Sequence, residues 1–169
     1  MRLITSDVAS PIGVLALAVD ERGRLRGVSF GDGLRRAMTR AYPDVAMEAG
    51  DAPDAIRRPL ADYFDGDLQA LMRIDWSLEG AVAGDGFQAR VWRALWETPV
   101  GKTLSYGEMA RRAGEAGAAQ AAGVALNRNP IPLVLACHRV VGADGAMVGF
   151  GGGLERKTWL LQHEGALLI

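Results

Sequence analysis

The chain changes its hydrophobic pattern at a short segment rich in glycine and alanine, residues 79–86, and this change constrains the fold most strongly. Before this segment, short apolar stretches alternate with turns, as in the strands of an antiparallel sheet. After it, apolar residues recur at spacings of three and four, as in amphipathic helices. We therefore predict an α+β protein in which residues 1–80 form a small N-terminal α/β support domain and residues 81–169 form a mainly helical C-terminal domain.

The first half predicts a β-meander combined with short helices. We expect strands at residues 3–5, 14–19, 25–30 and 71–76, and helices at residues 33–42 and 54–64. This half contains no cysteine and no histidine, and it has no glycine-rich phosphate-binding loop. We therefore expect it to support the fold rather than to carry chemistry.

The second half predicts a helix-turn-helix. Helices are expected at residues 87–97, 103–112 and 118–127, with Ser105 as an N-cap and Glu108 completing a capping box. A glycine-containing turn separates the last two of these helices, which is the sequence pattern of a helix-turn-helix. The last one is rich in alanine and carries Gly123, so its backbone can approach another surface closely. That surface is either a neighbouring helix or a DNA backbone.

Charge is distributed unevenly over the two halves. Residues 1–85 carry 10 Lys and Arg against 14 Asp and Glu, whereas residues 86–169 carry 9 against 6, which the net charge of −1 conceals. A basic second half permits binding to a polyanion but does not demonstrate it. No apolar run approaches the ~20 residues of a membrane span, and the first 20 residues are typical of a strand and turn rather than a signal peptide. We expect a cytoplasmic location, in which a lone thiol stays reduced.

The single cysteine of the chain, Cys137, immediately precedes one of its two histidines, His138. A proline-containing turn at residues 127–132 and an apolar segment at 133–136, predicted to be a strand, lead into this pair. Neighbouring side chains on a straight strand point to opposite faces, so the two can cooperate only through a bend or a bridging water. Glu164 is a further residue able to orient an imidazole. From these residues alone, Cys137 is either an activated nucleophile or a buried structural cysteine.

A set of short segments in residues 86–169 carries a family signature. They are Phe87-Gln88, Val91-Trp92, Pro99-Val100-Gly101, Ser105-Tyr106, Asn129-Pro130-Ile131-Pro132, Cys137-His138-Arg139-Val140-Val141, Gly151-Gly152-Gly153-Leu154, Lys157 and Leu160-Leu161. With these segments the second half resembles the O6-alkylguanine-DNA alkyltransferases, also called methylated-DNA–protein-cysteine methyltransferases. Residues 1–85 match more loosely, at Ser10-Pro11-Ile12-Gly13 and Tyr63-Phe64-Asp65-Gly66. The resemblance implies a ribonuclease H-like first domain and a winged-helix-like second domain that binds DNA and performs the reaction.

The resemblance also implies a direct-reversal DNA repair reaction. Cys137 would take the alkyl group from guanine O6, His138 would accept the thiol proton through a water, and Glu164 would hold the imidazole. Asn129 would brace the turn beneath the site, and Tyr106 would assist base rotation and protonate the leaving purine. The reaction would occur once per molecule, because a thioether is stable and no second cysteine exists.

Two further groups of residues follow from the resemblance. The helix at residues 118–127 would enter the minor groove, and the residues expected to contact DNA or flip the base are Gln120, Ala119, Arg128, Arg139 and Tyr106. The residues expected to line the pocket for the extruded base are Phe150, Gly151, Gly152, Val148 and Trp92. The preferred alkyl group, and any activity on O4-alkylthymine, stay open.

The sequence departs from the family pattern at three positions. Gln120 occupies the position of the arginine that fills the gap left by the flipped base, so we expect weaker DNA binding or weaker flipping. Ala136 replaces a proline before the cysteine, and Phe150 replaces a pocket tyrosine. The change to Ala136 frees a backbone dihedral, and the change to Phe150 removes a hydroxyl group.

Two other hypotheses stay open from the sequence. One is a relative that binds lesions in DNA without efficient transfer, although such relatives lack the cysteine. The other is a thiol enzyme that acts on a small molecule with Cys137, His138 and Glu164 as a triad. We expect no metal and no organic cofactor, double-stranded DNA containing alkylated guanine as the partner, no membrane association, and a monomer.

Overall fold

The computed structural model describes residues 1–82 and 86–167, and the chain separates into two units. The first consists of Met1–Val82 and Pro130–Val134, and the second of Ala83–Asn129 and Leu135–Ile169. Residues 83–85, within the segment rich in glycine and alanine, lie outside the described residues. The mixture of helices and sheets makes this an α+β protein, as the sequence predicts.

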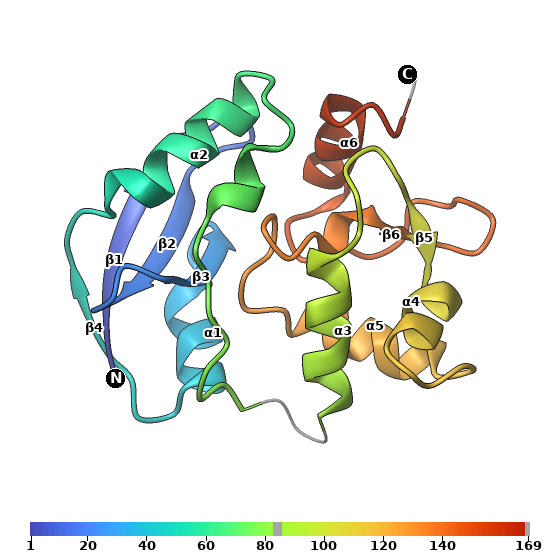
Figure 1. Ribbon diagram of the computed structural model, residues 1–169, viewed down its shortest axis with the longest axis horizontal. Helices are drawn as coiled ribbons and strands as arrows, with labels where there is room; N and C mark the ends of the chain where they lie inside the picture. Colours follow the sequence, from blue (N-terminus) through green and yellow to red (C-terminus); the bar gives the residue numbers. More distant parts are fainter. Residues whose placement is uncertain (83–85, 168–169) are drawn as a thin grey trace. The chain divides into compact units, whose positions relative to one another are not determined.

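The sheet of the first unit has the strand order β3-β2-β1-β4 (Figure 1). Strands β1 (Arg2–Val8), β2 (Leu15–Asp20) and β3 (Leu25–Phe30) form the predicted antiparallel meander. The edge strand β4 (Ala46–Ala49) pairs parallel to β1 and is missed by the sequence analysis. Its side chains are mostly exposed, so it lacks the apolar alternation by which a strand is recognised.

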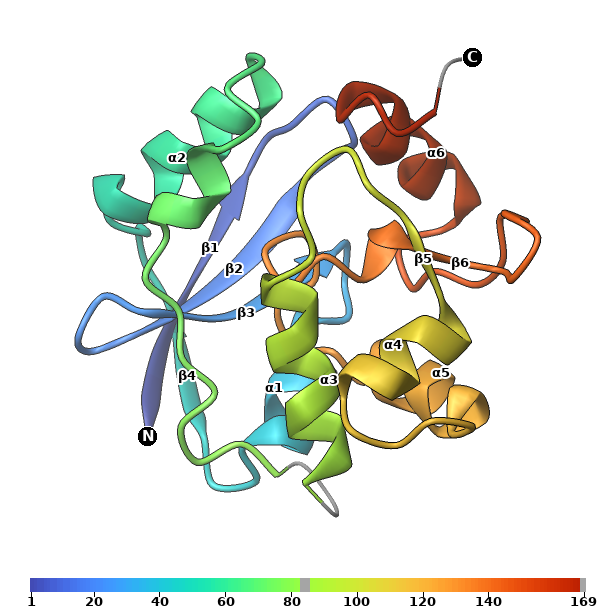
Figure 2. The ribbon, with the colours of Figure 1, turned by 45° about the vertical axis from the view of Figure 1, so that its right-hand side comes forward.

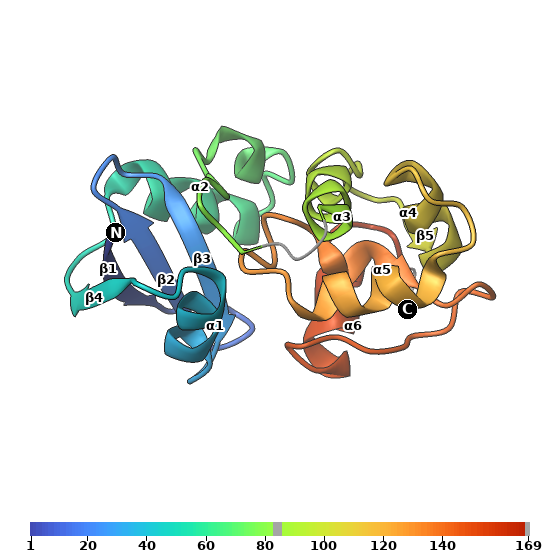
Figure 3. The same ribbon diagram turned by 90° about the horizontal axis from the view of Figure 1, so that it is seen from below.

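Helices α1 (Leu34–Ala41) and α2 (Asp54–Phe64) lie on opposite faces of this sheet (Figure 3). Every residue of β2 is buried, as expected for a strand covered on both faces. Both helices match their predicted positions closely. The core under α1 contains Leu3, Ala16, Ala18, Leu34, Met38, Ala41 and Tyr42.

The predicted strand at residues 71–76 is wrong. The chain instead forms a 3₁₀ turn, η1 (Ala70–Arg73), followed by a single parallel bridge between Leu25 and Trp76. Asp67 starts this turn, because its carboxylate accepts from the Gln69 N–H at 3.3 Å and its carbonyl accepts from the Ala70 N–H at 3.0 Å. Such local hydrogen bonds compete with strand pairing.

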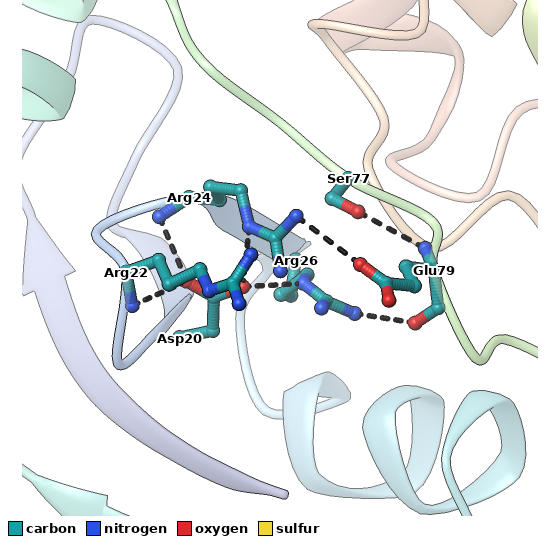
Figure 4. A network of polar contacts seen from close by, with 6 residues as sticks. All are labelled: Asp20, Arg22, Arg24, Arg26, Ser77 and Glu79. Atoms are coloured by element: carbon teal, nitrogen blue, oxygen red, sulfur yellow. Dashed lines mark hydrogen bonds and ion pairs between the residues drawn. The ribbon is translucent and has the colours of Figure 1, made fainter.

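A polar network built on Asp20 joins the β2–β3 hairpin to residues 77–79 (Figure 4). One carboxylate oxygen of Asp20 accepts from the backbone N–H groups of Arg22 and Arg24, and the other accepts from the side chains of Arg24 at 2.9 Å and Arg26 at 2.8 Å. Arg26 also donates to the Glu79 carbonyl at 2.7 Å. The segment rich in glycine and alanine therefore begins at a residue, Glu79, that Arg24 and Arg26 hold in place.

In the second unit, α3 (Phe87–Trp96), α4 (Tyr106–Arg112) and α5 (Ala119–Asn127) pack against one another (Figures 1 and 2). These confirm the three helices predicted from the sequence. Ser105 caps α4 by accepting from the Glu108 N–H at 3.1 Å, whereas the Glu108 carboxylate pairs with Arg111 and Arg112. The helix begins three residues later than predicted, because β5 (Leu104–Ser105) pairs with β6 (Val140–Val141).

Helix α6 (Leu154–His163) completes the second unit. Its buried residues are Lys157, Leu160 and Leu161, and it contacts the segment that carries the cysteine. Within residues 1–82 and 86–167, no helix combines the length and the apolar composition that a membrane span requires.

Candidate active site

Cys137, His138 and Arg139 form a 3₁₀ turn, η2 (Cys137–Arg139), rather than the end of a strand. The predicted strand at residues 133–136 is wrong, because Leu133 has a φ of 76° and turns the chain. Prolines 130 and 132 lack the N–H groups that a strand ladder needs. The Asn129 side chain then fixes the turn by donating to the Leu135 carbonyl at 2.7 Å.

This turn supplies the bend that cooperation between Cys137 and His138 requires. Successive side chains of a 3₁₀ helix point about 120° apart, rather than to opposite faces as on a strand. Cys137 accordingly lines a pocket, while His138 and Arg139 both contact Glu164, the C-cap of α6.

The pocket has a volume of about 420 Å³, within the range of small-molecule sites. Its residues come from α4, α5, η2 and the glycine-rich segment before α6. They are Tyr106, Ala119, Gln120, Gly123, Leu126, Asn127, Cys137, Gly149, Phe150 and Gly151. The pocket therefore brings the cysteine together with the exposed start of α5.

The thiol of Cys137 is protonated at rest. Burial raises the pKa of this thiol to about 11, although the Asn129 side chain and the charge of Lys157 both oppose the shift. The side chain nevertheless lines the pocket and is therefore within reach of a bound group. A base must remove the thiol proton before the sulfur can act as a nucleophile at neutral pH.

His138 is fully buried and is paired with Glu164. Its Nε2 lies 2.8 Å from Glu164 Oε2. Burial alone would raise the pKa of Glu164, but the charges and hydrogen bonds of His138 and Arg139 outweigh burial and hold this pKa well below its usual range. Glu164 is therefore an ionised hydrogen-bond acceptor.

This pairing determines which nitrogen of His138 can accept a proton. Burial lowers the pKa of His138 below its ordinary value, so the imidazole is neutral. Because Glu164 accepts, Nε2 carries the hydrogen and Nδ1 carries the lone pair. Nδ1 is buried, and no protein group in the described part of the chain hydrogen-bonds to it. The site thus holds a neutral base with one nitrogen fixed by the protein and the other available.

Lys157 is a member of the site that the sequence analysis did not assign. Its ammonium group is buried and donates to the carbonyl oxygens of Val140 at 2.5 Å, Val148 at 2.8 Å and Gly149 at 3.4 Å. Burial lowers the pKa of Lys157, while the nearby Cys137 opposes this. These bonds connect the pocket wall to β6, and they place a positive charge near the sulfur. The sequence signal was a lysine within a helix face that is otherwise apolar.

Two aromatic rings line the pocket near the cysteine. Burial raises the pKa of Tyr106, and the neighbouring Cys137 adds to this effect, so the phenol keeps its proton. Phe150 makes an edge-to-face contact with the His138 ring, with centroids 6.4 Å apart. The phenylalanine therefore packs the imidazole in place without offering a hydrogen bond.

Several predicted residues lie outside the pocket lining. Trp92 was expected to line it but is core, since its indole N–H donates to the Ala125 carbonyl at 2.8 Å and joins α3 to α5. Val148 and Gly152 contribute backbone carbonyls to Lys157 and Arg156 rather than surface to the cavity.

The two arginines expected on the DNA-binding surface differ in position. Arg128 is exposed at the C-cap of α5, where a phosphate could reach it. Arg139 is wrong as a DNA contact, because it is 6% exposed and its guanidinium is bound to Glu164 and to the Thr98 carbonyl. Among the residues the structure describes, no group of three His, Cys, Asp or Glu side chains is placed to hold a metal ion.

The sequence is similar to a family model and to relatives whose names describe methyltransferases. Residues 86–166 match the family model described as "6-O-methylguanine DNA methyltransferase, DNA binding domain". The methylated-DNA–protein-cysteine methyltransferase of Salmonella typhimurium is 40% identical over 174 residues, covering 100% of this chain and 99% of the relative.

Solved structures show the same fold. The crystal structure of Mycobacterium tuberculosis OGT in complex with DNA is 34% identical, with a TM-score of 0.74 over 98% of this chain and 93% of that one. The O6-methylguanine-DNA methyltransferase of Pyrococcus kodakaraensis is 25% identical, with a TM-score of 0.71 over 96% of this chain and 99% of that one.

Proposed function

The chain belongs to the methylated-DNA–protein-cysteine methyltransferase family, and from this premise we propose that Cys137 repairs O6-alkylguanine in duplex DNA by taking the alkyl group onto its own sulfur. The observation that carries the proposal is the position of Cys137. Its thiol lines a pocket that begins at the exposed end of α5, and the next residue is a neutral, carboxylate-oriented imidazole. A DNA-binding helix and a nucleophile thus share one cavity.

Helix α5 is the element that contacts the DNA. The helix presents exposed or partly exposed Ala119, Ala121 and Gly123, which are small enough for close approach to a groove. Gln120 is exposed beside them, and Arg128 follows at the end of the helix. A base within the stack is beyond the reach of a thiol, so the alkylated nucleotide is extruded into the pocket. Gln120 lines that pocket and is the residue that fills the gap left in the duplex.

The reaction then proceeds by proton removal and in-line displacement. His138 Nδ1 takes the proton of the Cys137 thiol through a bridging water, and the thiolate attacks the alkyl carbon from the side opposite O6. The S–C bond forms as the C–O bond breaks, and the electron pair of the C–O bond passes to the purine. Tyr106 donates a proton to guanine N3, and the imidazolium gives its proton to the resulting Tyr106 phenolate, so that both groups end neutral. The products are guanine and an S-alkylcysteine.

The thioether ends the activity of the molecule. Removal of the alkyl group would need a second nucleophile, and the chain has one cysteine. We therefore propose one transfer per protein molecule. The chemistry needs a thiol, a base and a proton donor, all of which the site supplies, so neither a metal nor an organic cofactor is required. We also propose that the protein acts as a monomer in the cytoplasm.

Two features favour transfer over lesion binding alone. Cys137 is present and lines the cavity, Asn129 fixes the turn before it through the Leu135 carbonyl, and the next residue, His138, is oriented by Glu164. A small-molecule thiol enzyme is disfavoured, because the cavity is built in part from the outward residues of the second helix of a helix-turn-helix.

The test is incubation with a duplex oligonucleotide containing one O6-methylguanine, followed by intact-protein mass spectrometry. We expect each protein molecule to gain one methyl group in place of one hydrogen, and Cys137→Ser to gain nothing while still binding the duplex. Binding without a gain in mass would support the lesion-binding alternative. A protein that neither binds nor gains mass would contradict both.

A further inference from the structure

Arg139 has no part in the reaction as described above, yet its side chain is among the most completely bonded in the site. Its Nε donates to Glu164 Oε1 at 2.9 Å and its Nη2 donates to Glu164 Oε2 at 3.0 Å, a two-point pairing of guanidinium and carboxylate. Its Nη1 donates to the Thr98 carbonyl, which anchors the guanidinium to the loop after α3. The residue is 6% exposed, so water screens this pair little.

The charged groups that act on the His138 imidazole come from two elements. From η2 comes Arg139, and from α6 come Lys157 and the capping Glu164, while the thiol of Cys137, which precedes the imidazole, is protonated and uncharged. Glu164 alone favours a protonated imidazole, whereas the two cations oppose it. Of the cations, only Arg139 bonds both oxygens of that carboxylate.

The consequence concerns where the proton of the thiol can go. A buried carboxylate paired only with an imidazole attracts a proton onto the ring, and an imidazolium is a donor at both nitrogens. Such a ring cannot take a proton from Cys137. A carboxylate already neutralised by a guanidinium still orients Nε2–H but leaves the ring neutral. The bidentate geometry also fixes Oε2 at 2.8 Å from Nε2.

We propose that Arg139 is a positioning residue for the methyl transfer: its guanidinium holds both oxygens of Glu164, which keeps His138 neutral and its Nδ1 able to accept the thiol proton. The inference rests on the proposed function, but the effect of Arg139 on the protonation of His138 can be measured in the protein without DNA.

The first test measures the imidazole directly. The chain has two histidines, so a His163→Gln background leaves His138 as the only histidine signal in an NMR titration. In Arg139→Met, which keeps an unbranched apolar side chain but removes the charge, we expect the pKa of His138 to rise by about one unit or more. An unchanged His138 titration in Arg139→Met would overturn the proposal.

The second test is the rate of methyl transfer in a single turnover, measured between pH 5.5 and pH 8.5 in steps of about half a unit, a window chosen around the ordinary histidine pKa of about 6.5. Arg139→Met is expected to lose more rate at pH 5.5 than at pH 8.5, because a raised His138 pKa lowers the neutral fraction of the imidazole at the acid end and leaves it unchanged at the alkaline end. A loss by the same factor at every pH would mean that Arg139 only supports the fold. Arg90→Met is the matched control, because Arg90 donates to the Ala113 carbonyl and does not bond Glu164 or His138. The pH dependence of its transfer rate should keep the shape of the parent's.

Arg139→Lys provides the second variant, and it remains informative if Arg139→Met fails to fold. Lysine keeps the charge but offers no planar fork, so the acid limb should stay near that of the parent while the rate on the plateau falls. A plateau rate equal to that of the parent would contradict the role of the two-point bond. If the parent gains no methyl group but the NMR shift occurs, the proposed function fails while the role of Arg139 in keeping His138 neutral holds.

Discussion

The polar network around Asp20 gives a stability prediction that does not depend on the chemistry of the site. Asp20 is 8% exposed and Arg26 is 4% exposed, and the two side chains are joined at 2.8 Å (Figure 4). The substitution Asp20→Asn keeps the size and one acceptor oxygen but removes the charge. It leaves the Arg26 guanidinium buried opposite a neutral amide, beside the partly buried Arg24.

The magnitude follows from burial. Removing one partner of a buried ion pair costs about 3–5 kcal/mol, and the partial exposure of Arg24 favours the lower end of this range. For a chain of this length, each kcal/mol corresponds to roughly 2–4 °C in Tm, so about 3 kcal/mol predicts a fall of roughly 6–12 °C. The assay is thermal unfolding followed by circular dichroism at neutral pH, checked against the midpoint of urea unfolding.

The matched control is Glu48→Gln, which breaks the exposed pair between Glu48 and Arg2. An exposed pair contributes about 0–1 kcal/mol, so this variant should unfold close to the parent. The pH dependence gives a second check. Burial alone would raise the pKa of Asp20, but hydrogen bonds from Arg24, Arg26 and Arg22 outweigh it and lower this pKa.

The contribution of Asp20 is therefore fully present above its unfolded pKa of about 3.9 and is lost as the pH falls through the lower folded value. The difference between Asp20→Asn and the parent should shrink in that acid range. Equal thermal stability of Asp20→Asn and Glu48→Gln at neutral pH would refute the assignment of this network as a buried ion pair.

Three further predictions concern the site. Gln120→Arg should bind duplex DNA containing O6-methylguanine more tightly or react with it faster, because a positive charge is added where the polyanion lies; a variant that gains neither affinity nor rate in binding and single-turnover assays would show that Gln120 is not at the gap. Lys157→Met should lower the transfer rate and destabilise the protein by about 1–3 kcal/mol, since buried carbonyls including that of Val140 lose their donor; retention of both the parental rate and the parental Tm would contradict its role in the pocket wall. The transfer rate of the parent should change little at neutral pH and fall only below pH ~6.5, because the lowered pKa of His138 keeps the base neutral above that value; a rate that falls already from pH 8 to pH 7 would contradict a neutral base.

The local elements were the most predictable part of the fold. The helices at α2 and α3 follow from apolar residues three and four apart, and the meander follows from short apolar stretches between turns. Strand β4 was not predictable, because its place depends on pairing with β1 more than 40 residues earlier rather than on its own pattern. The apolar residues 133–136 favoured a strand, but two prolines and the positive φ of Leu133 override that preference.

The site was predictable in its residue types but not in its pairings. Cys137 and His138 are evident as neighbours in the sequence. The 3₁₀ turn that points the Cys137 side chain to the pocket and the His138 side chain to Glu164 is not evident there. The partners of Arg139 lie 25 and 41 residues away, so an arginine within a conspicuous motif was assigned to DNA instead of to Glu164. Trp92 was assigned to the pocket from its place in a family segment, although the indole serves the packing of α3 on α5.

The most direct test of the central claim is the location of the transferred group. A duplex carrying O6-methylguanine with a deuterated methyl group would be mixed with excess protein, and the digested protein would be sequenced by tandem mass spectrometry. The account predicts that the label resides on the sulfur of Cys137, with one label per reacted chain and none on methionine, histidine or carboxylate side chains. Label on any other residue, or repaired guanine with no label on the protein, would contradict it.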